Sequence, residues 1–278
     1  MKLDSAVKKC ILSFFYFIVC CNQNESRPSY WPQVFRECKE RIVKEYYVPS
    51  FREPGFPPPQ RLLRKVFPSN PFNLKEIWSG SKARPKVALT FDACSTLRAS
   101  RFDSAVADIL NKTKTPATIF LGGKWVLDRP KDAVFLASIP FFEIGNHTYL
   151  HGHLTNVSED RLYFELLWTQ EIIFTVTGRI PAVFRPPYLE SNRKVAEAAA
   201  RLGLKTICGD LPSGDPDSNA SKERLIDEIK YHVHNGSIII MHINKGGKHT
   251  AEALPDIIQW LKNNGYELVT VGQLLEHD

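Results

Sequence analysis

The chain has 278 residues, of which 43% are hydrophobic and 24% are charged. This composition is sufficient for a large packed core and excludes an intrinsically disordered protein. The formal net charge of +6 is modest, and no cluster of Lys and Arg alternates with aromatic residues, so we expect no nucleic-acid partner.

The first segment, residues 1–21, has the pattern of an export signal. Two lysines precede an apolar run over 10–21, and the chain then turns abruptly polar. A basic flank followed by an apolar run of about a dozen residues is typical of a signal peptide and is short for a membrane-spanning helix. We expect export to the periplasm or the cell envelope. The alternatives are a short membrane anchor and a lipid on Cys20 or Cys21, either of which would attach the protein to a membrane.

The second segment, residues 22–85, is rich in proline and aromatic side chains. Prolines stand at positions 49, 54, 57, 58 and 59. Because such a series excludes regular helix, we expect an extended N-terminal arm that lies over the main domain. Trp31 and Trp78 either face a ligand or pin this arm to the core.

Three cysteines remain after the signal, at positions 38, 94 and 208. They are widely spaced and odd in number, and no Cys-x-x-Cys pattern occurs, so the sequence predicts neither a disulfide framework nor a cysteine-rich zinc site. We expect buried thiols that act as small apolar side chains, with one disulfide as the alternative in an oxidising compartment.

From residue 86 to residue 278, short apolar runs alternate with amphipathic stretches. Strands buried on both faces are predicted at 87–91, 117–121, 141–144, 182–184, 205–208, 238–241 and 267–270. Helices are predicted at 100–110, 158–176, 193–202, 222–233 and 251–263. This alternation predicts an α/β domain with parallel strands and outer helices, and about seven strands fit a closed or partly open (β/α) barrel.

Polar residues follow most of these strands directly. In chain order they are Asp92, then His147 and His151, then Arg185, then Asp210 and Asp215, and finally His242. Because functional residues of a parallel barrel gather at the carboxyl ends of its strands, we expect these side chains on one rim. Plainer interpretations are a helix cap for Asp92, an ion pair for Arg185 and a turn residue for Asp215.

The two histidines at 147 and 151 indicate a metal site. If residues 147–151 form a helical turn, both imidazoles project from one face and can bind one ion. Neutral imidazoles suit Zn²⁺ or a similar divalent metal, which can acidify a bound water and polarise a substrate carbonyl. Asp92 is then the candidate general base, and His242 is the candidate general acid.

Four motifs, in this order, carry a family resemblance: TFD at 90–92, NHTYLH at 146–151, FRPPY at 184–188 and IIMH at 239–242. They resemble the polysaccharide deacetylase family (NodB homology, carbohydrate esterase family 4) over roughly residues 85–275. The resemblance implies a distorted (β/α) barrel and metal-dependent removal of N-acetyl, or sometimes O-acetyl, groups from sugars.

The resemblance also suggests roles for further residues. It implies that Arg185 positions the Asp92 carboxylate and that Asp215 tunes the acid His242. Two prolines form a rigid turn after Arg185, which places Pro187 and Tyr188 at the wall of a substrate groove. Asn244 either lines this groove or simply belongs to the loop.

One position departs from the family motif. The second of two aspartates, usually a metal ligand, is replaced here by Ala93, which cannot bind a cation. Three outcomes remain open: Asp92 itself ligates the metal, Asp103 or Cys94 substitutes, or activity is lost. Because the base, the acid, the arginine and both histidines remain, we expect an active enzyme.

The sequence therefore predicts an exported, metal-dependent hydrolase that removes N-acetyl groups from an acetylated polysaccharide or oligosaccharide. It would cleave a carbon–nitrogen bond that is not a peptide bond. The alternatives are a catalytically impaired carbohydrate-binding protein and an O-acetyl esterase. No particular glycan, and no oligomeric state, follows from the sequence.

Overall fold

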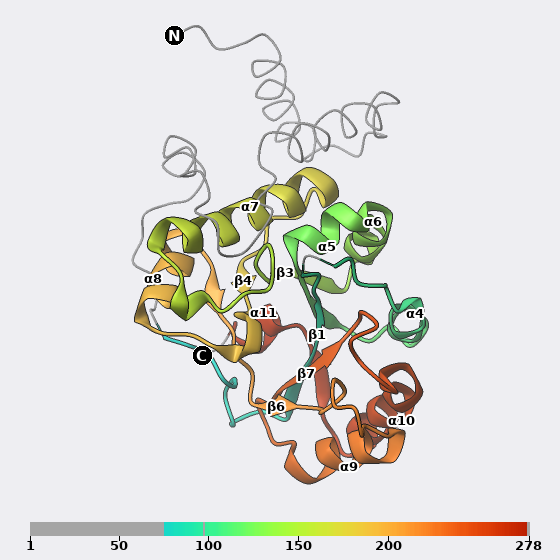
Figure 1. The fold of residues 1–278 in the computed structure, drawn as a ribbon. Coiled ribbons are helices and arrows are strands. Elements are labelled where there is room, and N and C mark those ends of the chain that lie inside the picture. Colours follow the sequence, from blue (N-terminus) through green and yellow to red (C-terminus); the bar gives the residue numbers. More distant parts are fainter. Residues whose placement is uncertain (1–74, 97, 277–278) are drawn as a thin grey trace, which may run out of the picture. The chain divides into compact units, whose positions relative to one another are not determined.

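A computed structural model describes residues 75–96 and 98–276, so the predicted signal and most of the predicted arm lie outside the described residues. The strands are β1 (Lys86–Ala93), β2 (Ala117–Leu121), β3 (Phe142–Asn146), β4 (Val183–Phe184), β5 (Lys205–Thr206), β6 (Leu211–Pro212), β7 (Ile238–His242) and β8 (Glu267–Val269). The helices are α4 (Ser104–Lys112), α5 (Gly123–Asp128), α6 (Pro130–Ser138), α7 (Glu159–Thr177), α8 (Arg193–Arg201), α9 (Lys222–His232), α10 (Thr250–Asn263) and α11 (Val271–Leu274). Figure 1 shows their arrangement.

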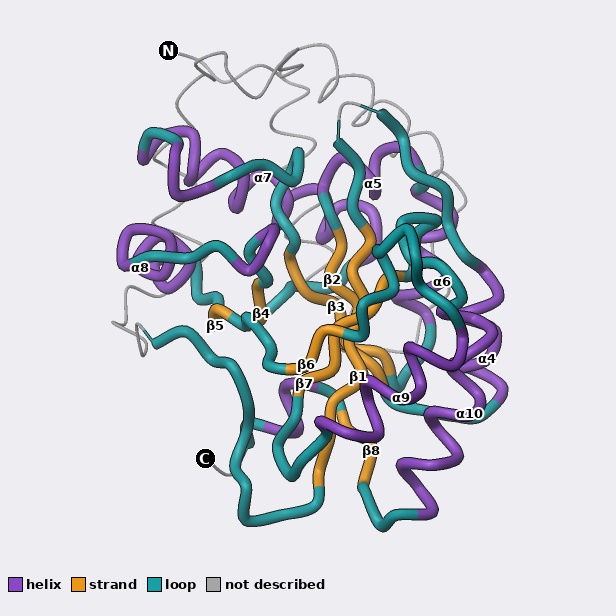
Figure 2. Tube along the Cα trace, turned by 60° about the horizontal axis from the view of Figure 1, so that its bottom comes forward, coloured by secondary structure: helices purple, strands orange, loops and turns teal. Residues whose placement is uncertain are grey.

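All strand pairs within the described residues are parallel, in the order β5-β4-β3-β2-β1-β7-β6. Ala88 of β1 pairs with Ile238 of β7 and also with Val269 of β8, so β7 and β8 lie on opposite edges of β1. The strands gather in the centre of the molecule and the helices surround them (Figure 2). The prediction of a distorted parallel (β/α) barrel is confirmed.

One apolar cluster joins side chains from five of the eight strands, from the residue just after β5 and from α11. This cluster consists of Ala88, Phe120, Val183, Ile207, Ile238, Val269, Val271 and Leu274, the last two from α11. A second cluster packs α7 and α8 against the end of β4 around Leu166, Phe184 and Leu202. Since both faces of the strands are covered, the runs are apolar without alternation, as the sequence predicts.

The predicted strand at 205–208 is present in its first half as β5, and a further short strand that was not predicted, β6, follows it. Gly209 separates β5 from β6 and has a φ of +86°, a conformation that residues with a side chain rarely adopt. A Cβ at this position would also lie 3.0 Å from the Ile240 side chain. The chain therefore turns at Gly209 and lays β6 against β7.

The last part of the predicted arm, residues 75–85, contacts the sheet. Ile77 forms a parallel bridge with Ile207, and the Gly80 amide donates to the Gly236 carbonyl. In the described part of the chain, no helix is both long and apolar enough to cross a membrane.

Candidate active site

The carboxyl ends of the central strands form one rim because the strands are parallel. Backbone hydrogen bonds just beyond the strands extend this alignment to the residues that follow them. The His147 amide donates to Leu121 O (3.0 Å), and the Arg185 amide donates to Asn146 O (2.9 Å). On the other side of β1, Asp92 is the register partner of His242 in β7. The sheet thus places Asp92, His147, Arg185 and His242 at the same level.

Asp92 lies at the centre of this rim and is buried. Arg185 Nη1 donates to Asp92 Oδ1 at 2.9 Å, and Asp92 Oδ2 lies 3.7 Å from His147 Nε2. Burial acts to raise the pKa of the Asp92 carboxyl, but its basic neighbours, with the Arg185 guanidinium first among them, outweigh burial and hold this pKa below its usual range. The carboxylate is therefore ionised at neutral pH.

Arg185 is fully buried and is held from one side by an aromatic ring. Its guanidinium carbon lies 4.2 Å from the centroid of the Phe120 ring. Within the described residues, only Nη1 of the guanidinium has a hydrogen-bond partner, while Nε and Nη2 are buried without one. The stacking and the ion pair together direct this side chain toward Asp92.

The loop after β3 brings His147 and His151 together, but the helical turn predicted at 147–151 is wrong. The segment is irregular, with positive φ values at Thr148 (65°) and His151 (54°). The reason is that side chains accept its amide protons: Asn146 Oδ1 accepts from Thr148 N at 2.9 Å, so that amide does not join a helix. The two imidazole centroids nevertheless lie 4.9 Å apart.

A buried carboxylate from α7 fixes the same loop. Glu165 Oε2 accepts the backbone amides of Tyr149 and Leu150, both at 2.8 Å. Its other oxygen accepts from Arg161 Nη2 at 2.7 Å, one helical turn earlier on α7. This ion pair was not predicted, although an Arg and a Glu four residues apart within an apolar helix indicate one.

The histidines of this loop are neutral. His147 Nδ1 lies 2.9 Å from the Arg185 carbonyl oxygen, which can only accept, so Nδ1 carries the proton and Nε2 keeps its lone pair. Burial lowers the pKa of His147. Burial, together with the neighbouring His147 imidazole, lowers the pKa of His151 to about 3. Neutral imidazole is the form that binds metal ions.

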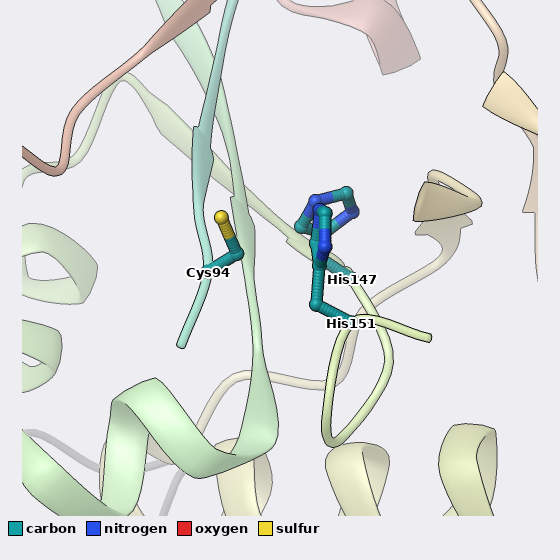
Figure 3. A group of neighbouring side chains, drawn as sticks. All are labelled: Cys94, His147 and His151. Atoms are coloured by element: carbon teal, nitrogen blue, oxygen red, sulfur yellow. The ribbon is translucent and has the colours of Figure 1, made fainter. Parts of the chain in front are cut away.

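A third ligand type lies beside these rings, at the end of β1. The Cys94 thiol and one nitrogen of each histidine, His147 and His151, all lie within 4.8 Å of one another. Figure 3 shows the thiol on the strand next to the two rings. Burial, together with the Asp92 charge, raises the pKa of the Cys94 thiol to about 11, so it is protonated at neutral pH unless a cation displaces the proton.

Asp103, an alternative for the missing ligand, is engaged elsewhere. One of its oxygens caps α4 by accepting from Ala105 N, and the other pairs with Lys245 Nζ at 2.8 Å. Ala93 is fully buried at the end of β1. Among the described residues, the group that could hold a metal ion consists of Cys94, His147 and His151.

On the opposite side of Asp92, His242 and Asp215 form a pair. Asp215 Oδ1 accepts from His242 Nδ1 at 2.9 Å, and its other oxygen accepts from His242 N and Thr250 Oγ1, both at 2.8 Å. Burial acts to lower the pKa of His242, but the hydrogen bond and charge of Asp215 outweigh it and raise this pKa. Since Nδ1 is engaged with Asp215, Nε2 is the ring nitrogen that remains for another partner.

The wall of the rim is formed by the FRPPY turn. Tyr188 has a φ of 58° and is 54% exposed, and its ring meets His151 edge-on with centroids 4.9 Å apart. His153 stacks on the same ring at 4.3 Å and bonds to Glu190 through Nδ1. Pro187 is buried in the turn. The stack with His153 and Glu190 was not predicted, because nothing in their sequence spacing connects them with Tyr188.

Two predicted residues have contacts other than those expected. The Asn244 side chain donates through Nδ2 to Cys94 O (2.8 Å) and to Cys94 Sγ (3.3 Å), so it is engaged with the end of β1. Asp210 does not reach the rim, because its carboxylate accepts from the amide of Ile238, the first residue of β7, and pairs with His234 at 2.9 Å. That is the opposite end of β7 from His242, so the placement of Asp210 on the rim is wrong.

Comparisons with known proteins show the family to which the chain belongs. The family model described as polysaccharide deacetylase matches residues 79–207. A bifunctional xylanase/deacetylase of Pseudobutyrivibrio xylanivorans is 32% identical over 68% of this chain and 30% of that protein. The peptidoglycan-N-acetylglucosamine deacetylase PgdA of Listeria monocytogenes is 31% identical over 70% of this chain and 40% of that protein. The chain thus spans less than half the length of either of these relatives.

Solved structures of the same fold include enzymes and a pseudoenzyme. The Xyl-CE4 domain of a multidomain xylanase, from the hindgut metagenome of Trinervitermes trinervoides, has a TM-score of 0.61 and 31% identity over 69% of this chain and 89% of that chain. A CE4 family pseudoenzyme from Bacillus anthracis has a TM-score of 0.67 and 25% identity over 74% of this chain and 70% of that chain. A mutant of that pseudoenzyme has restored enzymatic activity. By its motifs, its fold and these relatives, the chain belongs to the polysaccharide deacetylase family, carbohydrate esterase family 4.

Proposed function

We propose that the protein is an exported, metal-dependent deacetylase that removes N-acetyl groups from an acetylated polysaccharide or oligosaccharide. One observation carries most of this proposal. Asp92 and His242 are register partners on neighbouring strands, and each has its own oppositely charged partner, Arg185 for Asp92 and Asp215 for His242. A base and an acid side by side at the rim are what hydrolysis of an amide needs.

His147 and His151 are the residues that would hold a divalent metal ion. They fit such an ion because both rings are neutral and His147 Nε2 has its lone pair available while Nδ1 is occupied. When bound, a divalent ion such as Zn²⁺ lowers the pKa of a water molecule and polarises the carbonyl of the acetyl group. Neutral imidazole donors favour zinc over magnesium or calcium.

Asp92 is the proposed general base. Its Oδ1 is held by Arg185, whereas Oδ2 lies on the side of His147, where the attacking water would be placed. The lowered pKa keeps the carboxylate ionised and ready to accept a proton. Arg185 is a positioning residue, because it acts on the reaction through Asp92.

His242 is the proposed general acid. The raised pKa increases the fraction of the ring that is protonated near neutral pH, and Asp215 holds the ring through Nδ1. The proton on Nε2 is then the one given to the departing amine, which would otherwise be a very poor leaving group. Asp215 thus orients the acid and stabilises its charged form.

The exposed ring of Tyr188 supports a carbohydrate substrate. It lies beside His151 at the wall of the rim and offers an apolar surface on which a sugar ring can pack. Export is supported by the signal pattern at residues 1–21 and by relatives whose names refer to peptidoglycan, a polymer outside the cytoplasm. The acetylated glycan would therefore be met in the cell envelope or beyond it.

The test measures metal content and acetate release on the same preparation of the full chain, purified without chelator. We expect about one equivalent of divalent metal and acetate release from N-acetylglucosamine oligomers. His147→Ala should lose both metal and acetate release. Acetate released from acetylated xylan, with none from the N-acetylated oligomers, would contradict N-deacetylation and identify an O-acetyl esterase.

A second candidate function is carbohydrate binding without catalysis. Ala93 in place of the usual aspartate favours it, and a pseudoenzyme with the same fold exists. In that case the purified chain would bind acetylated oligosaccharides but release no acetate at any metal concentration. The intact pairs of Asp92 with Arg185 and of Asp215 with His242 favour the enzyme, because both pairs serve proton transfer more than sugar binding.

A further inference from the structure

We propose that Cys94 is the third protein ligand of the metal site, in the place that Ala93 leaves without a ligand. The centre would then consist of one thiolate and two imidazoles, from Cys94, His147 and His151. This inference rests on the proposed metal site, but it concerns which cation is bound and how, and its test measures metal binding without catalysis.

The geometry of the three side chains is the first argument. Their ligand atoms all lie within 4.8 Å of one another, with the thiol at the end of β1 and both rings on the loop after β3 (Figure 3). In a tetrahedral zinc site the sulfur and nitrogen ligand atoms lie about 3.3–3.7 Å from one another, so side-chain rotations that close the separations by roughly 1 Å would bring all three atoms onto one ion. Cys94 reaches this position although it stands one residue beyond Ala93.

The elements that carry these ligands are fixed to each other. The Gly122 amide donates to Ala93 O, and the Gly123 amide donates to the Thr148 carbonyl, both at 2.9 Å. A Cβ on Gly122 would lie 3.2 Å from Ala93 O and 3.5 Å from the Cys94 Cα. The absence of a side chain there lets the end of β1 approach the histidine loop closely.

The surroundings of the thiol are the second argument. Asn244 Nδ2 donates to Cys94 O at 2.8 Å and to Cys94 Sγ at 3.3 Å, while its Oδ1 accepts from Gly246 N at 3.0 Å. These bonds fix the cysteine from the loop after β7. A hydrogen bond to the sulfur stabilises a metal-bound thiolate, as outer partners of ligands commonly do. Asn244 is therefore a positioning residue for the ligand.

The chemistry of the centre follows from its charge and softness. Binding of a divalent cation displaces the thiol proton of Cys94, so one proton is released and the thiolate supplies the negative charge that an aspartate at 93 would have provided. Thiolate and imidazole donors favour Zn²⁺, Co²⁺ and Cd²⁺ and disfavour Mg²⁺ and Ca²⁺. The site should thus bind thiophilic cations even though Ala93 cannot bind any.

Cobalt reports a thiolate ligand directly. The full chain, stripped of metal with a chelator that is then removed, is titrated with Co²⁺ while the absorption spectrum is recorded. We expect a near-ultraviolet thiolate-to-cobalt charge-transfer band that saturates at about one equivalent. Cys94→Ser should abolish this band. Cys208→Ala is the matched control, because it removes a buried thiol elsewhere and should leave the band intact.

The positioning role of Asn244 has a separate expected effect. Asn244→Ala should keep the charge-transfer band and weaken cobalt affinity by about 10- to 100-fold, the usual cost of removing a partner of a metal ligand. Far-ultraviolet circular dichroism and the thermal transition of each variant establish that it is folded. A folded Asn244→Ala protein with unchanged affinity would contradict this role.

Several outcomes would overturn the assignment of Cys94. They are a band that persists in folded Cys94→Ser, cobalt bound at one equivalent without any charge-transfer band, and the absence of cobalt binding. The first two outcomes, together with continued acetate release, would leave the proposed function intact. A thiolate band that depends on Cys94, with no acetate released from any acetylated glycan, would instead support the ligand and contradict the enzyme.

Discussion

His147 and His242 lie on one rim, on either side of Asp92, yet their pKa values are shifted in opposite directions. Burial lowers the pKa of both rings. Around His242 the dedicated carboxylate of Asp215 reverses this effect, whereas His147 shares Asp92 with Arg185 and donates its own proton to a neutral carbonyl. One half of the rim therefore holds a histidine whose pKa is raised, as the proposed acid needs, and the other half holds neutral histidines, as the proposed metal ligands need.

The two halves also differ in what holds them in place. Asp215 makes its contacts with His242, Thr250 and the backbone of Lys248, all in the segment around β7 and the start of α10. The half with the histidine loop is fixed through Glu165 on α7 and Asn244 after β7. We therefore expect substitutions of Asp215 to change the acid half, and substitutions of Glu165 or Asn244 to change the metal half.

The largest expected effect comes from the residue between the two halves. Asp92→Asn should lower the rate of acetate release by about 10²- to 10⁴-fold, because the general base is lost while an amide can still accept from Arg185. Bound metal, measured on the same preparation, should be retained if His147, His151 and Cys94 are the ligands. Loss of metal in this variant would make Asp92 a ligand.

A substitution of Glu165 on α7 should weaken the metal half and lower the stability of the domain. Glu165→Gln removes the charge partner of buried Arg161 and weakens the contacts to Tyr149 and Leu150. We expect metal affinity to fall by about 10- to 100-fold. The free energy of unfolding, measured by denaturant titration, should fall by about 3 to 5 kcal/mol, as is usual when a buried ion pair loses one partner. A variant as stable as the parent would show that the pair does not fix the loop.

A substitution of Asp215 should affect the acid half alone. Asp215 raises the pKa of His242, so the protonated ring persists to higher pH than it would without the carboxylate. Asp215→Asn should therefore move the alkaline fall of kcat toward lower pH and reduce the rate at neutral pH by about 10-fold. Asp210→Asn, which also changes an aspartate paired with a histidine, should leave the pH of the alkaline fall of kcat unchanged. If Asp215→Asn does not shift this fall either, His242 is not the acid.

The smallest effect is expected at the wall of the rim. Tyr188→Ala removes an exposed ring and should raise KM for an oligosaccharide by about 2- to 10-fold with little change in kcat, as expected for one aromatic contact. Tyr231 on α9 is 82% exposed and has no contact with the rim residues discussed above, so Tyr231→Ala is the matched control. Equal KM values for the two variants would remove Tyr188 from the substrate site.

Much of the fold could be predicted because its signals are local. Apolar runs such as 117–121 become strands buried on both faces, and the polar residues that follow four of the runs, Asp92, His147, Arg185 and His242, reach one rim because the strands are parallel. The turn at Gly209 and the short strand β6 after it were not predicted. Asp210, next to it, consequently lies at the other end of β7.

The histidine loop shows what local signals could not provide. A spacing of four residues suggested a helical turn, but the conformation depends on Asn146 and on Glu165, which lies well outside the motif in sequence. Likewise, Cys94 could be named as an alternative ligand, but its contact with Asn244 depends on β7 lying next to β1. The roles assigned to Asp92, Arg185, Asp215 and His242 stay predictions until activity is measured.

The register of Asp92 with His242 also has a consequence for motion. Their spacing is set by the hydrogen-bond ladder between β1 and β7, and the Ile243 amide continues this ladder by donating to Asp92 O at 3.1 Å. Amides in such a buried ladder exchange with solvent only when the whole domain opens. The amide of Ile243 should therefore be among the slowest to exchange, and the proposed base and acid should keep their spacing up to the temperature at which the domain itself melts.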